Sequence, residues 1–184
     1  VRRSPVHSIA DAGNLARMIA NRPGFSLVGV MSYEAQVAGL ANDADGSALR
    51  NQAVSAIQSR SMRELVKRRG KAIDAIAQFA DLEFVNAGGT GSLEATAADP
   101  SVTDIAAGSG FFGGHLFDGY SPFQPAPAMG FGLDVVRRPA RDIVTVLGGG
   151  WIASGPPAPD RLPKPVWPSG LSYVASEAAG EVQT

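Results

Sequence analysis

Apolar residues near the start of the chain recur at the spacing of one helical face. Ser8 stands three residues before Asp11, a variant of the capping-box spacing that begins helices. The apolar positions that follow at helical spacing are Ile9, Ala12, Leu15, Ala16 and Ile19. The polar turn at residues 21–24 is expected to end this helix. A long second helix is predicted after the polar loop 42–47, with an apolar stripe formed by Ile57, Met62, Leu65, Val66, Ile73, Ile76 and Phe79.

Short apolar runs predict strands between and after these helices. Residues 25–32 (FSLVGVMS) are nearly all apolar, which favours a strand covered on both faces. Further strands are predicted at 82–85 and 102–107, with a short helix at 93–98 between them. Strands that alternate with helices are typical of a parallel sheet with covering helices. We therefore expect an α/β protein up to about residue 118.

The pattern changes after residue 120. Prolines at positions 122, 125 and 127 interrupt any helical spacing, and candidate strands at 129–137 and 142–147 follow without helices. A proline-rich irregular loop is expected over residues 156–168. These features predict two domains, 1–120 and 121–184, the second mainly β.

Composition and charge narrow the possible partners. The 184 residues include 22 Gly and 13 Pro, too many turns for a helical bundle, while 45% hydrophobic and 18% charged residues are a globular balance. The net charge of -1 provides no positive electrostatic potential that would attract nucleic acid or an anionic membrane. Apolar runs also fall short of the roughly 20 residues of a membrane helix. Without cysteine the redox compartment stays open, so the cytoplasm is the default expectation.

Glycine-rich turns follow two of the predicted strands, at residues 86–92 (NAGGTGS) and 108–114 (GSGFFGG). Glycine lets the backbone approach a ligand closely and point N–H groups at it, which suits a phosphate. The turn at 86–92 does not have the G-x-G-x-x-G pattern, and neither turn has the Walker pattern. Phosphate binding and plain tight turns therefore both remain open from spacing alone.

Six runs along the chain resemble one enzyme family. They are MSYEAQVAG (31–39), FVNAGGTGS (84–92), AAGSGFFGGHLFDGY (106–120), FGLDVVRRP (131–139), VTVLGGGWIASG (144–155) and EAAGEVQT (177–184). Together they resemble pyridoxal-phosphate enzymes of the alanine-racemase fold type, in the branch of D-threonine aldolase, D-serine dehydratase and amino-acid deaminase. The resemblance implies the C-terminal part of a TIM (β/α)8 barrel over 1–120, followed by part of a mainly β domain over 121–184.

The resemblance also implies a site for pyridoxal phosphate on three loops. In TIM barrels the loops after strands 7 and 8 often bind phosphate, and the two glycine turns match them. The implied cofactor-binding residues are Tyr33 beside the ring, Gly89, Thr90 and Gly91 at the phosphate, and Gly110 with Phe111 on its other side.

The family's Schiff-base lysine has no counterpart here. Lys67 and Lys71 fall on the polar side of the long helix, and Lys164 falls in the proline-rich loop. The family's metal ligands, a histidine with a cysteine or aspartate, would come after Thr184. We therefore expect a segment of a longer chain that contains no catalytic lysine or metal ligand and is inactive alone. His115 and Asp118 could share a metal, but a surface histidine and a turn aspartate are the favoured interpretation.

For the parent protein the resemblance implies a lyase that acts on D-amino acids at the Cα–Cβ bond, with pyridoxal phosphate and a divalent metal such as Zn or Mn. A homodimer is expected by analogy. The alternatives are an amino-acid racemase, a non-catalytic barrel protein that binds pyridoxal phosphate, and a structural fragment.

Overall fold

The computed structural model describes residues 4–44, 47–151, 161–174 and 182–183, and within them the protein is mixed α/β. The chain forms two compact units, one of residues 1–111 with 119–124 and the other of 112–118 with 125–184. Residues 112–118 belong to the second unit and 119–124 to the first, so residue 121, where a second domain is expected to begin, lies in the first unit. Each unit is described by itself.

Helix α1 (Ile9–Ala20) begins with the predicted capping box. The Asp11 amide donates to Ser8 Oγ at 3.1 Å, and the Ser8 amide donates to Asp11 Oδ2 at 2.9 Å. Asn21 caps the other end, so both predicted ends are confirmed. Of the predicted stripe only Ala12 and Ala16 are buried, because their small side chains pack against the next long helix.

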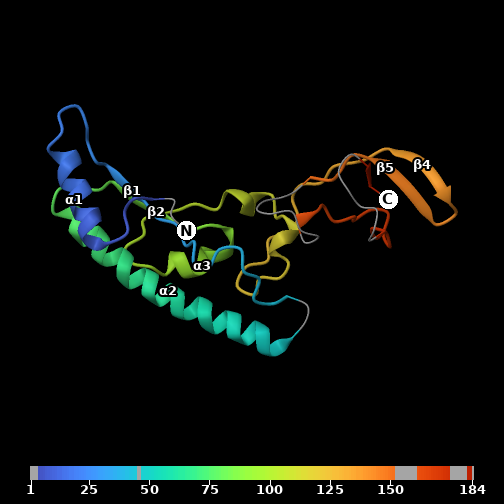
Figure 1. The fold of residues 1–184 in the computed structure, drawn as a ribbon, viewed down its shortest axis with the longest axis horizontal. Helices are drawn as coiled ribbons and strands as arrows, with labels where there is room; N and C mark the ends of the chain where they lie inside the picture. The colour runs from blue at the N-terminus through green and yellow to red at the C-terminus, as the bar shows by residue number, and fades with distance from the viewer. Residues whose placement is uncertain (1–3, 45–46, 152–160, 175–181, 184) are drawn as a thin grey trace. The chain divides into compact units, whose positions relative to one another are not determined.

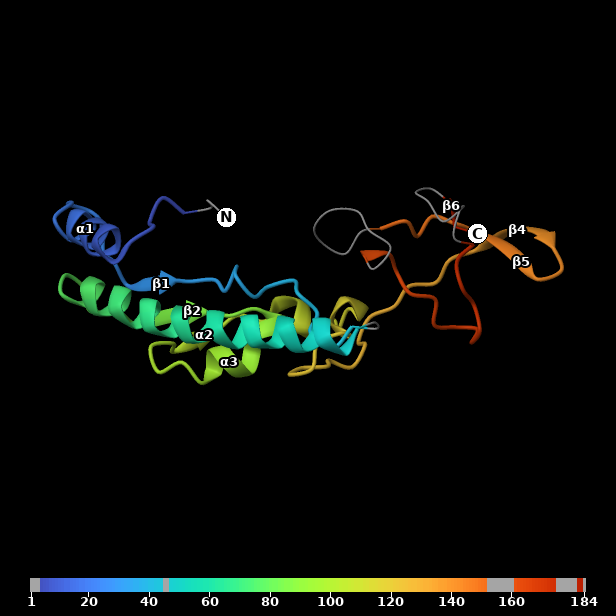
Figure 2. The same cartoon turned by 60° about the horizontal axis from the view of Figure 1, so that its bottom comes forward.

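Helix α2 (Ala48–Ala77) is the predicted long helix. Leu65 and Ile76 of its expected stripe are buried, whereas Ile57 is 59% exposed and Phe79 lies beyond the helix end. The core combines the C-terminal half of α2 with α1 and with Val30 of the first strand. Figure 2 shows α1 beside that half of α2. Arg69 is also buried on this helix, which the apolar pattern did not predict.

Three short strands form a parallel sheet in the order β1-β2-β3. Figure 1 labels β1 and β2 beside α1 and α2. They are β1 (Gly29–Met31), β2 (Phe84–Ala87) and β3 (Asp104–Ile105). Between β2 and β3 lie the 3-10 turn η1 (Thr90–Ser92) and the short helix α3 (Leu93–Ala97). The predicted order is confirmed, although β1 and β3 are shorter than the apolar runs that predicted them and β2 begins two residues later than predicted.

The sheet is covered on one face only. Val85 and Ala87 of β2 are buried, whereas Met31 at the end of β1 is 82% exposed and Phe84 is 41% exposed. Register pairs Gly29 with Phe84 and Met31 with Asn86, so the exposed positions share the other face. The expectation that the run 25–32 is covered on both faces is therefore wrong for the described residues, since α1 and α2 contact the opposite side.

The second unit contains an antiparallel sheet in the order β4-β5-β6. Its strands are β4 (Val135–Ala140), β5 (Ile143–Leu147) and β6 (Val182–Gln183), and the last was not predicted. The short turns η2 (Gly108–Phe111) and η3 (His115–Phe117) precede it in sequence. Parts of the expected proline-rich loop and of the two C-terminal motifs, at 152–160 and 175–181, lie outside the described residues. Within the described part, no helix is long and apolar enough to cross a membrane.

Candidate functional site

Three loops meet at the carboxyl edge of the parallel sheet. Because β1, β2 and β3 run in the same direction, the segments that follow them leave from one edge, which is where ligands bind in α/β sheets. Tyr33 follows β1, residues 89–91 follow β2, and residues 110–111 follow β3. All six predicted cofactor-binding residues therefore lie on loops of this edge.

The loop after β2 has no room for a side chain at Gly91, whereas a Cβ at Gly89 would be at ordinary contact distance from its neighbour. A Cβ at Gly91 would lie 2.6 Å from Cε1 of Tyr120, whose side chain is buried. A Cβ at Gly89 would lie 3.5 Å from Cε2 of Tyr33. Tyr33 is itself half exposed, so its ring lies at the open side of this loop. The result is a turn with glycine on both sides of Thr90, bordered by an accessible phenol.

A hydroxyl pair joins the loops after β2 and β3. Thr90 Oγ1 and Ser109 Oγ lie 2.6 Å apart, and Thr90 is almost fully buried. A Cβ at Gly110 would lie 3.5 Å from Thr90 Cγ2, so the two loops are in contact. The pair carries two hydroxyl protons and the hydrogen bond between them uses one, which leaves one for an anionic acceptor.

The loop after β3 forms the turn η2. The Gly110 amide donates to the Ala107 carbonyl at 2.9 Å, so a ligand oxygen would share or replace that hydrogen bond. Phe111 is 82% exposed. The roles expected of Gly110 and Phe111 stay predictions.

A buried charge cluster lies behind these loops, and the sequence interpretation missed it. Arg69 forms ion pairs with Glu34, directly after Tyr33, and with Asp99, where Nη1 and Oδ2 are 2.6 Å apart. Arg69 Nε donates to Ser32 Oγ at 3.0 Å. The Gly88 amide donates to Glu34 Oε2 at 2.9 Å. The available signal was an arginine four residues after Leu65 on the apolar face of α2, but Arg63, Lys67 and Arg68 nearby made it inconspicuous.

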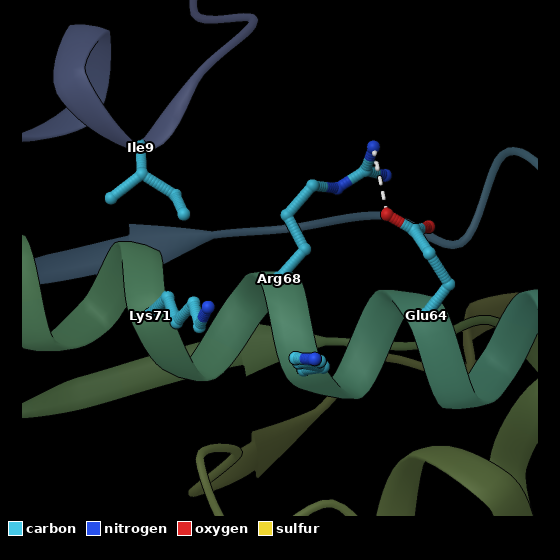
Figure 3. A pocket seen from close by; sticks show the side chains of 5 residues that line it. Ile9, Glu64, Arg68 and Lys71 are labelled. Atoms are coloured by element: carbon cyan, nitrogen blue, oxygen red, sulfur yellow. Dashed lines mark ion pairs between the residues drawn. The ribbon is translucent and has the colours of Figure 1, made fainter.

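Two of the three lysines lie on α2 of the first unit, and the third lies in the second unit. Lys67 and Lys71 are exposed on α2, where they line a shallow pocket with Ile9 and the Arg68–Glu64 ion pair of 3.4 Å (Figure 3). In the second unit Lys164 pairs with Asp118, with Nζ and Oδ2 3.3 Å apart.

His115 and Asp118 have separate partners. The His115 ring is hydrogen-bonded through Nε2 to the Leu162 carbonyl, while Asp118 faces Lys164. Across the residues that the structure describes, no three His, Cys, Asp or Glu side chains gather as a metal site would require. His115 is partly buried, whereas Asp118 is exposed.

Comparison with known proteins identifies the fold. No family profile matches the sequence, and no curated protein matches it. Among solved structures, D-threonine aldolase from Filomicrobium marinum matches with a TM-score of 0.56 and 19% sequence identity. The match covers 80% of this chain and 38% of the aldolase chain. This chain therefore has a fold related to that of D-threonine aldolase and spans a little over a third of its length.

Proposed function

We propose that this chain is part of a pyridoxal-phosphate-dependent enzyme that acts on D-amino acids as a lyase at the Cα–Cβ bond, of the aldolase, dehydratase or deaminase type. The observation that carries the proposal is the meeting of two glycine turns, the Thr90–Ser109 hydroxyl pair and Tyr33 at the carboxyl edge of a parallel sheet. The ordered motifs and the fold related to D-threonine aldolase support it. In this proposal residues 1–120 are the C-terminal part of a TIM barrel and 121–184 belong to a β domain.

The chain's own residues fit the phosphate end of the cofactor. Gly89 and Gly91 carry no side chain, and the hydroxyl proton left over by Thr90 and Ser109 is donated to a phosphate oxygen. Tyr33 lies beside the same loop, where its phenol orients the pyridine ring. When bound, the cofactor supplies an electron sink for the bond broken at Cα.

The described residues do not include a lysine on these loops. We propose that the parent protein supplies the cofactor's lysine and the Zn or Mn ligands from outside this chain, in a cytoplasmic homodimer. The 184 residues alone bind the phosphate group without turnover.

Binding is tested with 4′-deoxypyridoxine 5′-phosphate, which lacks the aldehyde and so cannot react with Lys67 or Lys71. Titration calorimetry should show binding to the wild-type chain, and affinity about tenfold lower for Thr90→Val, because one hydroxyl hydrogen bond to a charged acceptor is lost. Thr90→Ser is the matched control and should bind like the wild type. Equal affinity for 4′-deoxypyridoxine without phosphate would contradict the phosphate site.

Turnover is tested on the full-length parent enzyme with D- and L-threonine and D- and L-serine. We expect glycine with an aldehyde, or a keto acid with ammonia, from a D-substrate. Absence of these products from all four amino acids refutes the proposed activity.

A further inference from the structure

Glu34 connects a helix to the glycine turn after β2. Its side chain is fully buried, and its two carboxylate oxygens have different partners. Oε1 accepts from Arg69 of α2, whereas Oε2 accepts from the Gly88 amide at 2.9 Å. One carboxylate therefore links α2 to the residue directly before Gly89.

The backbone conformation at Gly88 favours glycine over other residues. Its φ of +96° is in the region that favours glycine, and a Cβ there would lie 3.1 Å from Ile105 Cγ2. Because its amide is buried, losing the acceptor would leave an unsatisfied donor. The hydrogen bond to Glu34 thus fixes the direction in which the chain enters residues 89–91.

Arg69 determines where the Glu34 carboxylate points. Its Nε, Nη1 and Nη2 donate to Ser32, Asp99 and Glu34, respectively. Asp99 in turn accepts from the Ser101 amide at 2.9 Å and the Ser101 hydroxyl at 2.7 Å. A planar guanidinium with three fixed acceptors has one orientation, so it holds Glu34 in one orientation too.

The cluster does not bind an anion itself. With both carboxylates ionised, Glu34, Asp99 and Arg69 carry a formal charge of -1, and the three guanidinium nitrogens already donate inside the cluster. The cluster therefore contributes to a phosphate site by holding the glycine turn in place.

We propose that Glu34 is a positioning residue for the phosphate-binding turn: its carboxylate, oriented by Arg69, holds the Gly88 amide and thereby sets the geometry of residues 89–91. This inference rests on the function proposed for that turn.

The test compares Glu34→Gln with Glu64→Gln, a matched change at an exposed glutamate of α2. Arg69 and Gly88 donate to different oxygens of Glu34, and glutamine has an NH2 donor in place of one of them, so in this orientation it cannot accept both hydrogen bonds. We expect hydrogen exchange of the Gly88 amide to become about tenfold faster, and affinity for 4′-deoxypyridoxine 5′-phosphate to fall about tenfold, as loss of one charge-assisted hydrogen bond implies. Glu64→Gln should change neither quantity.

Two outcomes overturn the proposal: wild-type exchange of Gly88 in Glu34→Gln, or faster exchange with unchanged affinity. If the wild-type chain binds no phosphate ligand, the proposed function fails, and Gly88 exchange alone then decides whether Glu34 positions the turn. If Glu34→Gln does not fold, Arg69→Lys is measured instead, since it keeps the positive charge but loses the planar fork. Gly88 exchange at the wild-type rate in Arg69→Lys refutes the role given to the guanidinium.

Discussion

Replacing Arg69 by methionine should destabilise the first unit strongly. The substitution keeps an unbranched apolar stem and removes the cation, so the side chains of Glu34 and Asp99, both fully buried, lose their counter-charge. Breaking a buried ion pair by removing one partner costs about 3–5 kcal/mol. A domain has about 5–15 kcal/mol of stability in total, so this loss is a large part of it. Arg68→Met is the control, because its half-exposed pair with Glu64 contributes about 0–1 kcal/mol.

The measurement is urea unfolding of the full chain, followed by circular dichroism at 222 nm. Both α1 and α2 lie in the first unit, so the helical signal reports on that unit. The free energy of unfolding should fall for Arg69→Met and stay near the wild-type value for Arg68→Met. A triple variant with Glu34→Gln and Asp99→Asn added should recover part of the loss, because neighbouring changes that remove the buried charges are not additive. A decrease below about 1 kcal/mol for Arg69→Met would refute the reasoning.

Two further predictions concern the glycine turn and the first helix. Gly91→Ala should lower the free energy of unfolding by about 1–3 kcal/mol and weaken phosphate-ligand binding, because its Cβ would lie 2.6 Å from Tyr120. Gly108→Ala is the control, since the space around its Cβ is open. Equal decreases of the thermal unfolding temperature in the two variants would contradict this prediction. Ser8→Ala should cost about 1 kcal/mol in urea unfolding. The Ser8 hydroxyl and nearby backbone amides lower the pKa of Asp11, so its stabilising contribution is present above about pH 4 and is lost as the pH falls through the lowered value. An acid titration of helicity that is the same in wild type and Ser8→Ala would contradict that assignment.

Sequence alone predicted the features that depend on near neighbours. The capping box at Ser8, the stop at Asn21 and the order of helices and strands follow from contacts a few residues apart. The glycine turns after β2 and β3 were also visible, because glycine clusters directly after apolar runs.

Tertiary structure decided which charged residue is buried and which sheet face is covered. Helical spacing placed Arg69 near the apolar face of α2, but its burial depends on Asp99, Glu34 and Ser32, which are 30, 35 and 37 residues away in sequence. Likewise, the apolar run that contains Met31 did not reveal that α1 and α2 cover only the opposite face. A local pattern sets the direction of a side chain relative to its own element. The free energy of burying a charge depends on partners that only the folded chain brings within hydrogen-bonding distance.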